Sequence, residues 1–104
     1  MKILITESRI YNAFKRFIEM EIEDGNLEVI TSKKGIIYFI DKDVNCYMSI
    51  YPNNTSMIKK EMYDMVKDYF SIDHLELLKL FERYLSEKFN LDNVDAFFMN
   101  IKGK

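Results

Sequence analysis

Residues 56–90 constrain the fold most, because their apolar side chains repeat with the period of an α-helix on both sides of a short break. Apolar positions three and four residues apart share one side of a helix at 100° per residue. The first stripe comprises Ile58, Met62, Met65, Val66, Tyr69 and Phe70, and the second comprises Leu77, Leu78, Phe81, Tyr84, Leu85 and Phe89. We therefore expect a helical hairpin that buries both stripes against another layer, most simply the strand-rich segment before it.

The break at residues 71–73 predicts where the second helix begins. Asp73 and Glu76 have the spacing of a capping box, in which the first side chain accepts a hydrogen bond from a first-turn amide. Phe81 lies near the middle of the second stripe, so we expect it in the core. A helix-turn-helix fits the pattern less well, because a base-reading helix carries Arg, Lys, Asn or Gln at its start, whereas this one begins Asp73-His74-Leu75-Glu76.

The segment before the hairpin predicts one more helix and a sheet. Thr6 or Ser8 can cap a first helix, which should end near Glu23 because Asp24-Gly25-Asn26 is a turn sequence. Strand-like runs rich in β-branched and aromatic residues follow at 27–31, 36–40 and 46–51, with a closing run at 94–101. The order α-β-β-β-α-α-β predicts an α+β fold, an antiparallel sheet of about four strands packed with three helices.

Length and composition bound the class of protein. With 104 residues, 48% hydrophobic and 31% charged, the chain has the profile of a single globular domain over residues 1–104. A net charge of −2 gives no general attraction to nucleic acid, and no apolar run approaches the ~20 residues that span a bilayer. Cys46 is the only cysteine, so no internal disulfide forms, and we expect a cytoplasmic protein with no membrane partner.

Chemistry-bearing residues are scattered rather than grouped. His74 is the only histidine, and no second His or nearby Cys supplies a metal or catalytic partner. Asp41 to Asn45 begins like a calcium loop, but Cys46 and Pro52 stand where that loop needs Gly and Glu, so a polar hairpin turn is the better interpretation. We therefore predict no catalytic residue, no metal ligand and no cofactor, and hence a protein that is not an enzyme.

The aromatic strand residues are the one candidate surface for a partner. Tyr47 and Tyr51 are an even number of residues apart, so period-2 geometry places both rings on one face of the sheet. If residues 36–40 pair with residues 46–51 so that the odd-numbered residues share one face, the candidate partner-binding residues are Tyr47, Tyr51, Phe39 and Ile37. A one-residue shift of register would substitute Tyr38 and Ile40. The favoured arrangement puts the first helix over this face and the hairpin over the other.

The N-terminus carries a resemblance. Lys2-Ile3-Leu4-Ile5-Thr6-Glu7-Ser8 resembles the start of many small, uncharacterised proteins of tailed phages, and the C-terminal order of two helices and a strand is similar to some of them. The resemblance implies a phage or phage-derived accessory protein in the host cytoplasm. It implies no known activity and no functional residue.

Because the sequence indicates no catalytic residue, no metal site and no attraction to nucleic acid, we expect a non-enzymatic protein-interaction module that binds a host or viral protein. A homodimer is its simplest form, because a two-fold axis needs only one self-complementary surface. The alternative is single-stranded nucleic-acid binding, with bases stacked on the aromatic face and Lys33 and Lys34 at its edge. Salt separates the two hypotheses, since affinity for phosphates falls steeply with ionic strength.

Overall fold

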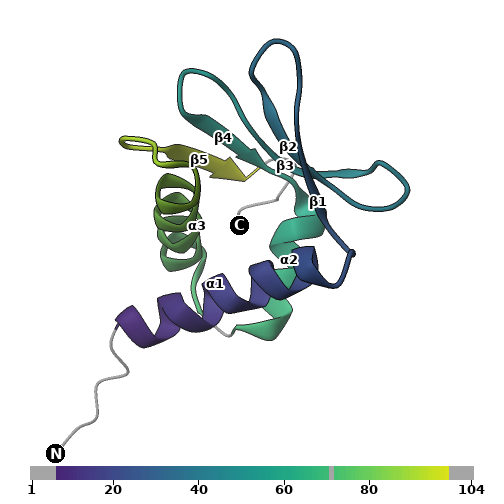
Figure 1. The fold of residues 1–104 in the computed structure, drawn as a ribbon. Coiled ribbons are helices and arrows are strands. Elements are labelled where there is room, and N and C mark those ends of the chain that lie inside the picture. Colours follow the sequence, from purple (N-terminus) through teal and green to yellow (C-terminus); the bar gives the residue numbers. More distant parts are fainter. Residues whose placement is uncertain (1–6, 71, 99–104) are drawn as a thin grey trace, which may run out of the picture.

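The computed structural model describes residues 7–70 and 72–98, which form an α+β fold of three helices and one five-stranded sheet (Figure 1). The elements in chain order are α1 (Glu7–Glu23), β1 (Glu28–Thr31), β2 (Ile37–Ile40), β3 (Cys46–Ile50), β4 (Thr55–Ile58), α2 (Lys60–Tyr69), α3 (His74–Phe89) and β5 (Asp95–Phe98). The predicted α+β class is confirmed, with one strand more than the sequence indicated.

The strands lie in the order β1-β2-β3-β4-β5, so each strand pairs with its neighbour in the chain. The first four form an antiparallel meander, and β5 joins the edge parallel to β4 after the two intervening helices. Figure 1 shows all three helices on one side of the sheet. The expectation that α1 would cover one face and the helical hairpin the other is therefore wrong.

The fourth strand corrects the sequence prediction. Residues 56–58 were expected to open the first helix of the hairpin, but β4 pairs with β3 and α2 begins only at Lys60. A turn makes this pairing local: Asn54 adopts φ 68° and donates its N–H to the Tyr51 carbonyl oxygen. Ile58 is fully buried, so its place in the apolar pattern fits a strand residue as well as a helix residue.

The helix ends follow local chemistry. α1 ends at Glu23 as predicted, and the next turn contains Gly25 at φ 83°, a conformation that glycine adopts without strain. At the start of α3, Asp73 Oδ1 accepts a hydrogen bond from the Glu76 N–H at 3.1 Å, which confirms the predicted cap. Of the two predicted caps of α1, Ser8 is wrong, because the helix already includes Glu7. The other, Thr6, and residues 99–101 of the predicted closing strand lie outside the described residues.

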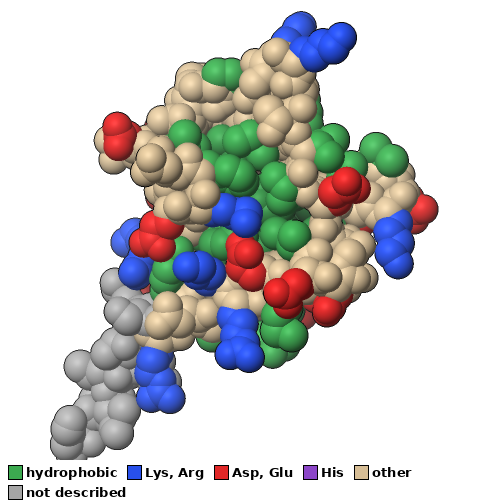
Figure 2. Space-filling view, viewed as in Figure 1, with side chains coloured by type: hydrophobic (Ala, Val, Ile, Leu, Met, Phe, Trp, Pro, Cys, Tyr) green, Lys and Arg blue, Asp and Glu red, His purple; other side chains and the backbone are tan. Residues whose placement is uncertain are grey.

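One core joins the sheet to the helices. Phe14 of α1 meets Phe81 and Tyr84 of α3 edge to face, with ring centroids 4.9 and 6.1 Å apart. Phe81 is fully buried, as predicted. Tyr69 departs from its predicted stripe: 67% of it is exposed, and its ring stacks on Phe17 at 4.6 Å. In Figure 2 hydrophobic side chains also reach the surface in a hollow between sheet and helices, rimmed by charged residues.

Within the described residues, no helix is long and apolar enough to cross a membrane.

Candidate functional site

The face of the sheet turned away from the helices, here called the outer face, carries a row of side chains that crosses all five strands. The strand register places one residue of each strand in this row: Ile30, Tyr38, Ser49, Met57 and Phe97. Four of the five are large and apolar or aromatic. Side chains directly opposite on neighbouring strands lie about 4.5–5.5 Å apart at Cβ, so the row is continuous. We call these five residues the outer row.

Exposure is greatest at the two ends of the outer row. Ile30 on β1 is 39% exposed and Phe97 on β5 is 52% exposed, while Tyr38 and Met57 are half-buried. Ser49 at the centre is only 4% exposed, because its side chain is short and its larger neighbours flank it. No member of the outer row belongs to the described core or to the half-buried residues packed against it. The row therefore has no partner among the described helices.

A β-bulge decides which tyrosine reaches this face. Phe39 pairs with Met48, but the next residue, Ile40, pairs with Cys46, so Tyr47 is the extra residue of β3. A bulge breaks the alternation of side chains along a strand. Tyr47 is half-buried and packs against the core, and burial together with Asp41 raises the pKa of its hydroxyl above the ordinary value.

Three of the four predicted partner-binding residues thus lie on the helix side of the sheet. Phe39 is fully buried in the core, and Ile37 and Tyr47 pack against it. Only Tyr51 stays outside the core cluster, half-buried beside Thr55 at the end of the face. The predicted grouping of all four residues on one face is wrong: Ile37 and Phe39 share a face with Tyr47 but not with Tyr51. The register instead pairs Tyr38 with Ser49, so Tyr38 lies on the outer face, as in the shifted alternative.

Three members of the outer row, Ile30, Met57 and Phe97, were not predicted from the sequence. Met57 was missed because β4 was assigned to a helix. Phe97 lies on a strand that was predicted, and period-2 alternation from the buried Ala96 would have marked it as outward-facing. Ile30 likewise alternates with Val29, which packs against the core.

Charged residues stand near the four corners of the outer face. On the β1 side, Glu28 begins the strand, and Lys33 and Lys34 occupy the turn that follows it; Figure 2 shows basic side chains at the tip of this turn. On the opposite side, Asp95 begins β5 and Lys59 follows β4.

The strand directions fix which corners share an end of the sheet. β4 is antiparallel to β1, so Lys59 lies at the end where Glu28 lies. Asp95 pairs with Thr55 at the end that carries the β1–β2 turn, where Gly35 lies close to Pro52 of the neighbouring turn. Lys59 is two residues after Met57, so we expect its side chain on the same, outer side of the sheet. Burial raises the pKa of the Cys46 thiol, and the positive charge of Lys59 partly offsets this rise. Acidic and basic corners therefore alternate around the face.

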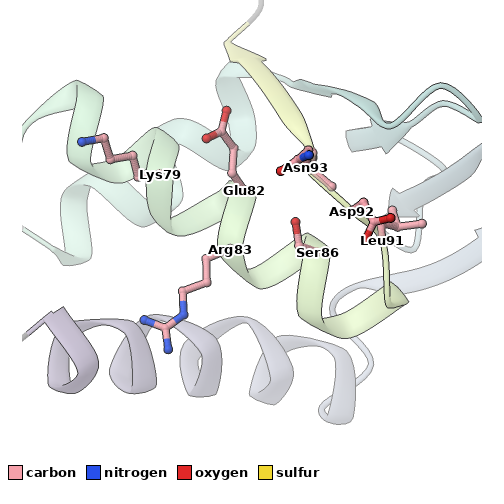
Figure 3. A pocket seen from close by; sticks show the side chains of 8 residues that line it. Lys79, Glu82, Arg83, Ser86, Leu91, Asp92 and Asn93 are labelled. Carbon is pink, nitrogen blue, oxygen red and sulfur yellow. The ribbon is translucent and has the colours of Figure 1, made fainter.

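A shallow groove of about 590 Å³ lies between α3 and the loop before β5 (Figure 3). Arg83 points away from it toward α1, where its guanidinium carbon lies 3.9 Å from the centroid of the Tyr11 ring. Its Nε also contacts Glu87 of α3 at 3.2 Å. Glu82 accepts a hydrogen bond from the Ala96 N–H at 3.0 Å. The Glu82 carboxylate therefore covers an outward amide of the edge strand β5, a protection common for exposed sheet edges.

The remaining candidates have structural roles. His74 packs against the rings of Tyr63 and Phe98, with centroids 5.6 and 4.7 Å away. Asp41 Oδ1 accepts the N–H groups of Asp43 and Asn45 at 2.9 Å each, which makes this segment the predicted polar turn. These backbone hydrogen bonds, chiefly that of Asn45, hold the pKa of Asp41 below its ordinary value.

Comparison of the chain with protein families, curated proteins and solved structures finds no match.

Proposed function

We propose that this chain is a protein-interaction module without catalytic activity, and that its binding surface is the outer face of the sheet. One observation carries the proposal: the outer row runs from edge to edge and is exposed most at its two ends, Ile30 and Phe97. A sheet with one face on the core normally shows polar residues on the other face. A contiguous apolar patch on a monomer is typical of an interaction site.

The charges on this face favour a protein over a nucleic acid. Glu28 and Asp95 are exposed and belong to the strands themselves, and a carboxylate repels phosphate. The lysines near the face, Lys33, Lys34 and Lys59, do little more than balance these two acids. Single-stranded nucleic-acid binding needs a groove with a clear excess of positive charge beside its stacking platform. An apolar row with mixed charges around it matches the anatomy of a protein interface, with an apolar centre and a polar rim.

Site-specific photo-cross-linking tests the proposal directly. A photoreactive phenylalanine analogue is placed at position 97 on the outer face, or at position 75 on the surface of α3 as a matched control. Phe97 and Leu75 are both large apolar side chains, 52% and 66% exposed. Irradiation in cells that express the protein natively, followed by mass spectrometry, should give a protein adduct from position 97 and much less adduct from position 75.

Two outcomes would overturn the proposal. Equal protein adducts from both positions would show that the outer face has no special role. Adducts of position 97 with nucleic acid, together with binding of a labelled oligonucleotide that weakens steeply with salt, would assign the face to nucleic acid instead.

The resemblance to small phage proteins stays a prediction. The expectation that the partner is a host or viral protein in the host cytoplasm is also a prediction. Identification of the cross-linked protein tests it.

A further inference from the structure

We infer that the partner of the outer face is a second copy of this chain, packed face to face about a two-fold axis; this inference rests on the proposed function. The reason is the arrangement of charge. Glu28 is diagonal to Asp95, and the lysine pair of the β1–β2 turn is diagonal to Lys59. The four corners of the outer face therefore alternate in charge from one to the next: acidic, basic, acidic, basic. Such a pattern is complementary to its own two-fold image.

The complementarity holds for a two-fold axis along the strands and for one across them. A two-fold axis between the two sheets and along the strands exchanges the sheet edges, so Glu28 faces Lys59 of the second copy. An axis across the strands exchanges the strand ends, so Glu28 faces Lys33 and Lys34 of the second copy. Asp95 meets the remaining lysine or lysines in each case. Either closed dimer brings every acidic corner over a basic one, as isologous interfaces require.

The profile of the outer row suits the same contact. The row has its most exposed side chains at its ends, Ile30 and Phe97, and its shortest side chain, Ser49, at its centre. An axis along the strands brings the Ile30 end of one row over the Phe97 end of the other, with the two serines facing at the centre. Stacked sheets pack about 10 Å apart with interdigitating side chains, and this pairing fills that space without a clash of two large residues at the axis.

The size of the face predicts a weak, reversible dimer. Five strands about 4.8 Å apart span roughly 19 Å, and strands of four or five residues are roughly 13–17 Å long. The flat footprint is therefore roughly 250–320 Å² per copy. Such a contact buries less than the ~1,200 Å² at which standard specific interfaces begin, which is the range of weak, transient encounters. We therefore expect association that depends on concentration, not a permanent dimer.

Sedimentation velocity on the full chain, over a concentration series from about 5 µM to about 1 mM at low salt, measures this association. One variant makes all four corners basic, Glu28→Lys with Asp95→Lys. A second makes them all acidic, with Lys33→Glu, Lys34→Glu and Lys59→Glu. Glu23→Lys with Asp68→Lys, on exposed sites of α1 and α2, is the matched control for a change of charge. Circular dichroism and thermal melts confirm that each variant is folded.

The wild-type chain and the control should form the same reversible dimer. Each corner variant alone should associate at least about tenfold more weakly, because like charges then face each other across the axis. A mixture of the basic and acidic variants in equal amounts should restore a 1:1 complex. A wild-type chain that stays monomeric throughout, or corner variants that dimerise as the wild type does, or a mixture that does not associate, would overturn the inference.

Failure of this inference is distinguishable from failure of the proposed function. A monomeric chain whose position 97 cross-links to a different protein keeps the outer face as a binding surface and rejects only the second copy. A dimer that cross-links through position 75 and not through position 97 rejects both.

Discussion

Two tyrosine–carboxylate contacts fasten α1 to α3. The Tyr11 hydroxyl donates to Glu87 Oε1 at 2.7 Å, and the Tyr84 hydroxyl donates to Glu19 Oε2, which also accepts from Lys88 at 2.9 Å. Burial tends to raise the pKa of Glu19, but the hydrogen bonds from Tyr84 and Lys88 outweigh it and the pKa lies below its ordinary value. Hydrogen bonds from Tyr11 and Arg83 lower the pKa of Glu87 in the same way.

These shifts predict a loss of stability in acid. A carboxyl whose pKa is lower in the folded than in the unfolded chain stabilises the fold above its unfolded pKa. That stabilisation disappears as pH falls below the ordinary value of 4.5 and through the folded value. Urea melts at pH 7 and at about pH 3.5 should show a smaller pH-dependent loss of unfolding free energy in Tyr84→Phe than in the wild type. Tyr63→Phe, a control away from both carboxylates, should keep the wild-type dependence.

Ser56 on β4 has a buried hydroxyl without a hydrogen-bond partner among the described residues. It lies between Ile50 and Ala96 on the core face, and it is fully buried. An unpaired buried hydroxyl costs about 1–3 kcal/mol, so Ser56→Ala should raise the free energy of unfolding by about 1 kcal/mol in denaturant melts. Ser49→Ala on the outer face is the control, and it should not give the same rise in the free energy of unfolding. A clear loss of stability in Ser56→Ala would mean that the hydroxyl has a partner.

At the scale of elements, β3 shows how one inserted residue changes a strand. The bulge turns Tyr47 toward the helix side, while Tyr51 remains outside the core cluster. The two tyrosines therefore differ in role although their spacing in the sequence suggests a shared face.

Charge substitution separates the two tyrosines experimentally. Tyr47→Glu places a carboxylate against apolar side chains and should lower the free energy of unfolding by about 1–3 kcal/mol. Tyr51→Glu should change it by less than about 1 kcal/mol, because that ring does not pack on the core. Equal losses in thermal or denaturant melts would contradict the assignment of the two faces.

The N-cap of α3 is a second local feature that shapes an element. Asp73 Oδ1 satisfies one of the amides that a helix leaves unpaired in its first turn. Asp73→Ala should therefore lower the free energy of unfolding by about 0.5–2 kcal/mol. Asp73→Asn, which keeps an acceptor oxygen, should lose much less in the same melts, and an equal loss in both variants would exclude the capping bond as the cause.

At the scale of the whole molecule, one residue links the layers. Phe81 of α3 is fully buried, and its ring meets Phe14 of α1 at 4.9 Å and Phe98 of β5 at 6.1 Å. Truncation at such a point leaves a cavity between a helix, a second helix and the sheet.

Phe81→Ala should therefore cost about 3–5 kcal/mol, a large part of the ~5–15 kcal/mol that stabilises a domain of this size. Leu75→Ala on the same helix, at a site that is 66% exposed, should change stability by no more than about 0.5 kcal/mol. A loss below about 1 kcal/mol for Phe81→Ala in denaturant melts would contradict the packing of α3 described here.

The sequence by itself determined the features that depend on near neighbours in the chain. Helical periodicity identified α1, α2 and α3, the turn at Gly25 ended α1, and the Asp73 cap separated the two helices of the hairpin. Three strands of the meander and the place of β5 followed from β-branched and aromatic runs between turn residues. The burial of Phe81 followed from its place in the strongest stripe. These features rest on backbone geometry over a few residues, which the local sequence encodes.

Only the tertiary structure decided which face each element presents. β4 is too short to show a period, and its apolar residue Ile58 fits a helix stripe equally well until β3 pairs with it. The bulge at Tyr47 separated this residue from Tyr51, because one unpaired residue changes which side chains share a face. The placement of all three helices on one side of the sheet exposed the outer row (Figure 1). That choice depends on how separate amphipathic surfaces share one core, a property of the assembled layers and not of any single segment.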